Sequence, residues 1–146
     1  MRSRNSIRVI VHSLSGTMLL LVGIAPVSAA DWPTFKPGQW SFERTLSGAG
    51  APQEKVSTTE CTDPTADQKE QQAMLTKAGC QFTPLAQSGK TYRYSATCKM
   101  GGMTSKSDSV LEVESAEAYT VTVDSTVDGQ KSHEVLRARR TGDCKR

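Results

Sequence analysis

The sequence predicts a small, mainly β (α+β) domain: a single antiparallel meander sheet or a partly open barrel, with one short helix and disulfide staples. Two observations support this prediction. Apolar and polar residues alternate in several short segments separated by turn residues, which is typical of strands with one buried face. The same part of the chain holds all four cysteines, Cys61, Cys80, Cys98 and Cys144.

An export signal precedes this part. Residues 1–30 combine an arginine-rich start, a mostly apolar run and a small-residue end, the pattern of a secretory signal peptide. We expect cleavage after Ala30, with Ala29 as the second choice. An uncleaved anchor is disfavoured because polar residues shorten the apolar run below the roughly 20 residues of a membrane span. The expected location is the periplasm, reached through a Sec-type signal, rather than the extracellular space, with no transmembrane anchor left after cleavage.

The mature domain, residues 31–146, carries no excess charge. The whole chain has 18 basic and 15 acidic residues, and Arg2, Arg4 and Arg8 lie in the signal segment. Basic and acidic residues are therefore equal in number in the mature domain. A neutral domain gives no bulk electrostatic reason to bind nucleic acid.

The strongest strand pattern lies in residues 90–103. Tyr92, Tyr94, Ala96 and Cys98 share one face, and Gly101-Gly102 follows as a turn. Residues 39–46 alternate similarly, with Arg44 as the exception on an otherwise apolar face. The remaining expected strands are a weak edge strand at 53–61, then 80–86, 104–113, 119–127 and 131–140, with turns at 87–89, 114–117 and Asp128-Gly129.

One helix is expected over residues 62–78. Asp63 suits its N-cap, Pro64 its first position, and Gly79 the position just past its end. Its apolar content is thin, and the polar run 67–72 predicts a solvated face. Such a helix is marginal alone.

Four cysteines in an exported domain indicate two disulfides, with three connectivities available. We predict Cys61–Cys80, closing a loop around the helix, and Cys98–Cys144, joining the central strand to the C-terminus. A zinc site is disfavoured because such sites favour closely spaced cysteine pairs, and no two cysteines here are nearer than eighteen positions. We therefore expect no metal and no cofactor.

Several segments together resemble a family of small exported bacterial proteins, found mainly in Gram-negative bacteria and catalogued as domain of unknown function 3617. The segments are Lys36-Pro37-Gly38-Gln39-Trp40, Thr59-Glu60-Cys61 with Asp63-Pro64, Cys80, Cys98 with Gly101-Gly102-Met103, and Arg139-Arg140-Thr141-Gly142-Asp143-Cys144. Gln39 and Thr141 stand where leucine is usual. The resemblance implies a periplasmic, β-rich domain with a cysteine framework, and it supplies no catalytic residues.

Catalytic chemistry is poorly supported. His133 is the only histidine after the signal segment, and no motif gives it a nucleophile and an orienting group. We interpret it as a surface histidine on a strand. Glu112, Glu114 and Glu117 are interpreted as a solvated rim, since calcium sites need more ligands at tighter spacing. The prediction is that the protein is not an enzyme.

Two groups of residues are candidates for binding. A cavity on the inner face of a curled sheet would be lined by Trp40, Phe42, Arg44, Tyr92, Tyr94 and Tyr119. A phosphate or lipid head group could contact Arg137, Arg139 and Arg140, although pairing with the glutamate rim is favoured. An inward Arg44 needs an acidic partner or a ligand anion.

The resulting hypothesis is a periplasmic, non-enzymatic binding or envelope-accessory module for an apolar or amphipathic molecule. The alternative is a disulfide-stapled structural or protein-interaction domain with a solid core and no ligand. The sequence does not identify the partner, which could be such a small molecule or an envelope protein.

Overall fold

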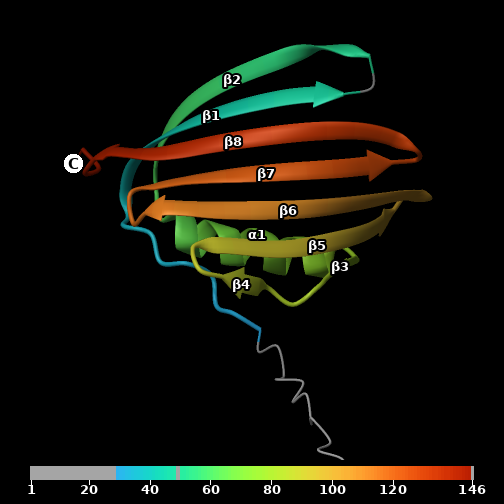
Figure 1. Ribbon diagram of the computed structural model, residues 1–146, viewed down its shortest axis with the longest axis horizontal. Helices are drawn as coiled ribbons and strands as arrows, with labels where there is room; N and C mark the ends of the chain where they lie inside the picture. Colours follow the sequence, from blue (N-terminus) through green and yellow to red (C-terminus); the bar gives the residue numbers. More distant parts are fainter. Residues whose placement is uncertain (1–28, 49, 146) are drawn as a thin grey trace, which may run out of the picture.

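The computed structural model describes residues 29–48 and 50–145, so the expected signal peptide lies almost wholly outside it. Within these residues, eight strands form one open antiparallel sheet with a single helix, as predicted (Figure 1). The elements are β1 (Gly38–Gly48), β2 (Ala51–Thr62), α1 (Pro64–Lys77), β3 (Cys80–Phe82), β4 (Ala86–Ser88), β5 (Thr91–Met100), β6 (Met103–Ser115), β7 (Ala118–Val127) and β8 (Gln130–Gly142).

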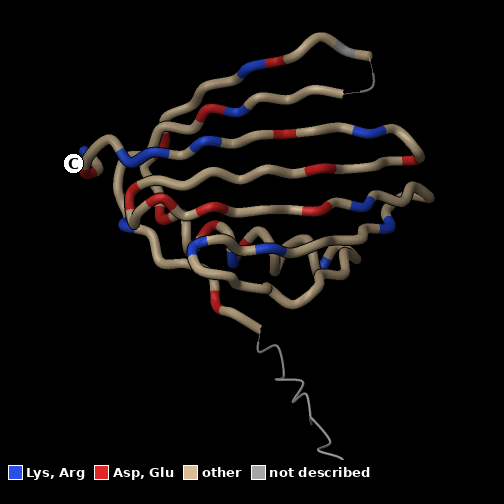
Figure 2. Tube along the Cα trace, viewed as in Figure 1, with Lys and Arg blue, Asp and Glu red and all other residues tan. Residues whose placement is uncertain are grey.

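The strand order is β2-β1-β8-β7-β6-β5-β3, with β4 also paired to β5. Strands β5 to β8 form a meander of hairpins, and β1 joins its end by pairing antiparallel with β8. This places β2 at the sheet edge, as expected. Figure 1 shows the sheet curving over α1, and Figure 2 shows basic and acidic residues interspersed along its strands.

The segment expected as one strand at 80–86 is instead two short strands, β3 and β4. Pro84 lies between them and has no N–H to donate to a ladder, while Leu85 turns into the core at 8% exposure. Strand β4 also includes two of the residues expected in the following turn, which is instead made at Gly89 with a φ of 58°.

The core fills one end of the concave face, the face that α1 covers. It consists of Phe35, Trp40, Leu85, Tyr92, Leu111, Tyr119 and Ala138. Trp40 and Leu111 are fully buried. The ring of Tyr119 lies 4.4 Å from that of Phe35 and 5.6 Å from that of Trp40, measured between centroids. The first distance is at the short limit of favourable aromatic pairs and the second is within their range.

The helix is positioned by polar contacts at its start. The Asp63 carboxylate accepts hydrogen bonds from the backbone N–H groups of Thr65 and Ala66, at 3.0 and 3.2 Å, which confirms the predicted N-cap. The side chain of Thr65 accepts from the backbone of Phe35 at 2.8 Å, and Gln72 accepts from the Trp32 indole at 3.0 Å. The last two bonds tie α1 to the segment that precedes β1.

The predicted disulfide pairing is wrong. The bonds are Cys61–Cys144 and Cys80–Cys98, with Cα–Cα distances of 5.6 and 4.0 Å. The 14 residues of α1 span about 21 Å at 1.5 Å per residue, so cysteines at its two ends cannot reach each other. Strand pairing decides the partners instead. Cys80 lies directly opposite Cys98, and the β2-β1-β8 order brings the C-terminal tail beside Cys61.

We predict that the two disulfides differ in their effect on stability. On the loop-entropy model, losing the 18-residue loop of Cys80–Cys98 costs about 3 kcal/mol, and losing the 83-residue loop of Cys61–Cys144 costs about 4.5 kcal/mol. Urea unfolding of the C80A/C98A and C61A/C144A double variants measures both values. Non-reducing peptide mapping checks the pairing, and a fragment linking Cys61 to Cys80 would contradict it.

Candidate functional site

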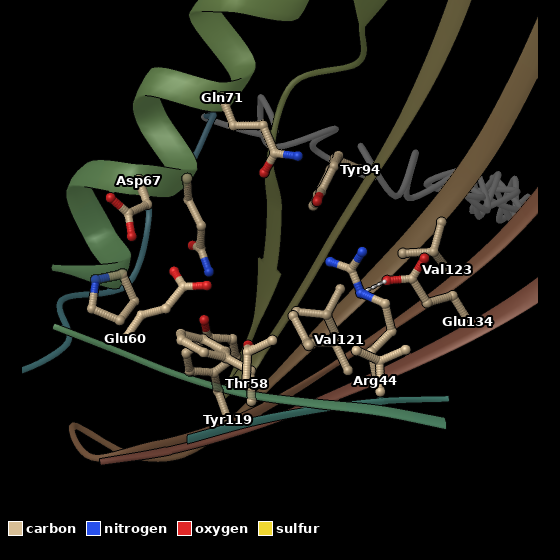
Figure 3. A pocket seen from close by; sticks show the side chains of 15 residues that line it. Arg44, Thr58, Glu60, Asp67, Gln71, Tyr94, Tyr119, Val121, Val123 and Glu134 are labelled. Carbon is tan, nitrogen blue, oxygen red and sulfur yellow. Dashed lines mark ion pairs between the residues drawn. The ribbon is translucent and has the colours of Figure 1, made fainter. Parts of the chain in front are cut away.

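A cavity of about 520 Å³ lies between α1 and the concave face of the sheet, beside the core (Figure 3). Its lining comes from five strands and from the helix α1. The lining residues are Phe42, Arg44, Val56, Thr58, Glu60, Pro64, Asp67, Gln68, Gln71, Tyr94, Tyr119, Val121, Val123, Glu134 and Leu136. Volumes of 300–1,000 Å³ are usual for small-molecule sites.

The strands supply an apolar floor. Phe42, Val121 and Leu136 lie on the same face as Trp40 and Tyr119, because side chains two residues apart share a face of a strand. This floor continues the core along the trough, the space between α1 and the concave face of the sheet. It remains partly accessible to solvent, whereas Trp40 beside it is fully buried.

The helix supplies a polar roof. Five helix positions are partly or fully buried: Pro64, Thr65, Gln68, Gln72 and Leu75. All but Thr65 recur at helical spacing, and two of the five are glutamines. Asp67, Gln68 and Gln71 line the cavity. Asp67 and Gln71 are exposed as predicted. Gln68 and Gln72 are partly buried, so the prediction of a solvated face over residues 67–72 is wrong for these two. The spacing of glutamines in register with Pro64 and Leu75 is the sequence signal that could have identified them.

Arg44 does lie on the concave face, and it has an acidic partner. Its Nε lies 3.0 Å from Oε1 of Glu134, which is a diagonal neighbour on β8. The side chains are 56% and 27% exposed, so the pair stands in the open part of the cavity. Figure 3 shows it across the cavity from Asp67 and Glu60.

Two tyrosines line the cavity with neutral phenols. The pKa of Tyr119 is raised to about 12, mainly by burial; a hydrogen bond with Gln68 opposes the shift, and the charge of Asp67 adds to it. Burial also raises the pKa of Tyr94, against a hydrogen bond with Ser109. Both hydroxyls can therefore donate and accept hydrogen bonds at neutral pH.

The structure divides the six residues predicted to line a cavity. Phe42, Arg44, Tyr94 and Tyr119 do line it, whereas Trp40 and Tyr92 belong to the core at 0% and 9% exposure. Sequence reasoning missed the lining residues on β2 and α1. Their contact with the cavity depends on where the fold places these two elements, which the local sequence does not show.

The arginine cluster does not assemble into one site. Arg139 pairs with Glu114 at 3.4 Å, and Arg140 pairs with Glu117 at 3.5 Å and with Asp143. This is the pairing with the glutamate rim that the sequence favoured. Arg137 lies on the convex face opposite Glu43, away from Arg140.

His133 also lies on the convex face. Its Nδ1 is 2.7 Å from an oxygen of Asp124, and its side chain is 48% exposed. It is thus separated from the cavity by the sheet. Over residues 29–48 and 50–145, no cluster of three or more histidine, cysteine or acidic residues could hold a metal ion, and no helix is long and apolar enough to cross a membrane.

The fold and the cavity define a disulfide-stapled β domain with a helix over its concave face. The chain belongs to the family described as "Protein of unknown function (DUF3617)", which it matches over residues 35–144. This confirms the family that the sequence motifs indicated. Neither the curated proteins nor the solved structures contain a match to the chain.

We predict that Tyr119 makes folding stability fall with alkaline pH. Its phenol ionises near 10.0 in the unfolded chain and near 12 in the folded protein. The stabilisation is complete below pH 10 and is lost as the pH rises through 12, because only the unfolded chain releases the proton in between. Urea unfolding at pH 9 to 11.5 should therefore show a shallower decline for Tyr119→Phe than for the wild type. Parallel declines would contradict the prediction.

Proposed function

We propose that this protein is a non-enzymatic binding module that holds an amphipathic small molecule in the cavity between α1 and the sheet. The observation that carries the proposal is the cavity itself, which combines an apolar floor with a polar roof. Pockets for small molecules combine apolar walls with a few placed polar groups in this way. The ligand's apolar part lies over Val121, Val123 and Leu136, and its polar part meets the helix.

A solid structural domain without a ligand is the alternative function. The filled aromatic end of the trough favours it, since Trp40 and Leu111 are fully buried there. The unfilled part of the same trough favours a ligand, because tightly packed domains leave few voids larger than a water molecule.

We also propose that the protein acts in the periplasm after removal of its signal peptide. Two disulfides with no free cysteine among the described residues suit a compartment outside the cytoplasm. The backbone N–H of Ala30 donates a 2.8 Å hydrogen bond to the carbonyl of Leu85, and Ala30 packs against the core. These contacts favour cleavage after Ala29, which keeps Ala30 in the mature chain.

We predict Ala30 as the first residue of the protein recovered from the periplasm. The retained residue keeps one backbone hydrogen bond and one apolar contact with the core. N-terminal sequencing together with intact mass measures the cleavage site. A start at Asp31 would contradict this prediction without affecting the binding proposal.

We predict that the folded protein binds one molecule of N-phenyl-1-naphthylamine, a neutral apolar probe whose fluorescence rises on burial. Val123→Trp should weaken this binding at least tenfold, because the larger ring occupies the cavity. The matched control is Val135→Trp, which adds the same ring to the convex face of the neighbouring strand and should leave binding unchanged. Fluorescence titration measures both effects.

Native mass spectrometry of protein from periplasm provides the second test. A bound small molecule at one-to-one stoichiometry, absent from Val123→Trp, supports the proposal. A bare mass combined with no saturable probe binding contradicts it and supports the solid structural domain.

A further inference from the structure

The charges around the cavity identify a class of ligand, an inference that rests on the proposed function. Three carboxylates, from Glu60, Asp67 and Glu134, line the cavity with one guanidinium, from Arg44. Arg44 and Glu134 pair with each other at 3.0 Å. Within the described residues, neither Glu60 nor Asp67 has a basic side chain within ion-pair distance. The cavity therefore holds two carboxylates in excess.

The two excess carboxylates are supplied by different elements and lie toward the same end of the cavity. Glu60 comes from β2, on the concave face opposite Trp40, and Asp67 comes from the first turn of α1. Figure 3 shows both on the side of the cavity near Tyr119, away from the Arg44–Glu134 pair. One oxygen of Asp67 accepts a hydrogen bond from the Thr62 hydroxyl, which holds the carboxylate in place and leaves its charge uncompensated.

Gln68 adds an independent indication that a donor is missing. Its side chain hydrogen-bonds with Tyr119, but its Oε1 atom is buried at the cavity and has no hydrogen-bond partner among the described residues. A buried acceptor without a partner is destabilising, and the large majority of buried side-chain polar atoms in proteins are paired. A ligand group with N–H donors would satisfy this oxygen and would also face the two carboxylates.

We propose that the cavity selects amphipathic molecules with a cationic amine or ammonium head group. The head group lies beside Glu60 and Asp67, and the apolar chain extends over Val121 and Val123 toward the Arg44–Glu134 pair. An anionic amphipath in the same position would place its charge against two carboxylates. A head group with N–H donors binds more tightly than a quaternary ammonium, because only the former can donate to Gln68.

The test uses two competitors with the same ten-carbon chain and opposite charge, decylammonium and decanoate. Each displaces N-phenyl-1-naphthylamine from the folded protein at pH 7.5 and low ionic strength. We expect decylammonium to act at a concentration at least tenfold lower, corresponding to about 1.4 kcal/mol. The preference should shrink in 0.5 M NaCl, because salt screens exposed charges.

The variant E60Q/D67N should reduce this preference to less than threefold while probe binding persists. The matched control is E43Q/E112Q, which removes the same charge from the convex face and should keep the full preference. Because Asp67 is bonded to Thr62, E60Q alone serves if the double variant does not fold, and it should lower the preference about threefold.

The outcomes separate this inference from the proposed function. Absence of saturable probe binding overturns the proposed function and this inference with it. Probe binding with equal displacement by decylammonium and decanoate overturns the inference alone. An unchanged preference in E60Q/D67N also overturns it, because the two carboxylates would then not be its source. An equal loss in the convex-face control overturns it as well, because the selectivity would then come from the overall charge of the protein.

Discussion

The helix is attached to the sheet at both ends by covalent bonds, and the rest of the structure depends on this constraint. Cys61, just before α1, bonds to Cys144 in the tail after β8, and Cys80, just after α1, bonds to Cys98 on β5. The Asp63 cap and the Trp32–Gln72 hydrogen bond hold the helix further. A helix fixed in this way needs no apolar stripe to stay in place, so its inward side is free to carry glutamine and aspartate.

The same constraint explains why the cavity persists beside a packed core. In an ordinary packed helix, the inward residues are apolar and fill the space above the sheet. Here Gln68 and Gln71 face the floor that Val121 and Leu136 provide, and the apolar packing ends at the aromatic group around Trp40. Closing the trough by collapse would bury amide and carboxylate groups without partners, which is costly.

The strands and the helix could be predicted from the sequence because their signals are local. Alternation at Tyr92, Tyr94 and Ala96 identifies a half-buried strand without knowledge of its neighbours, and Asp63 with Gly79 marks the helix ends. Inward placement of Arg44 followed from the same alternation.

The disulfide partners and most of the cavity could not be predicted, because they depend on non-local pairing. Cys61 meets the tail only because β1 pairs with β8 across most of the chain. Glu60 reaches the cavity for the same reason, since β2 follows β1 to the sheet edge. Helix length alone, however, was sufficient to exclude the Cys61–Cys80 bond.

The distribution of exposed apolar side chains favours a ligand over a merely structural role. Among the residues that the structure describes, the large exposed apolar ones are Leu46, Val56, Met74, Met100, Met103 and Val127. By strand register, all but Met74, which lies on the helix, belong to the concave face. A domain with no ligand has no reason to keep its solvent-exposed apolar side chains on the face that already carries its core. If the face holds an amphipathic molecule, the same residues continue the apolar surface of the cavity, and a bound chain would remove part of that surface from water.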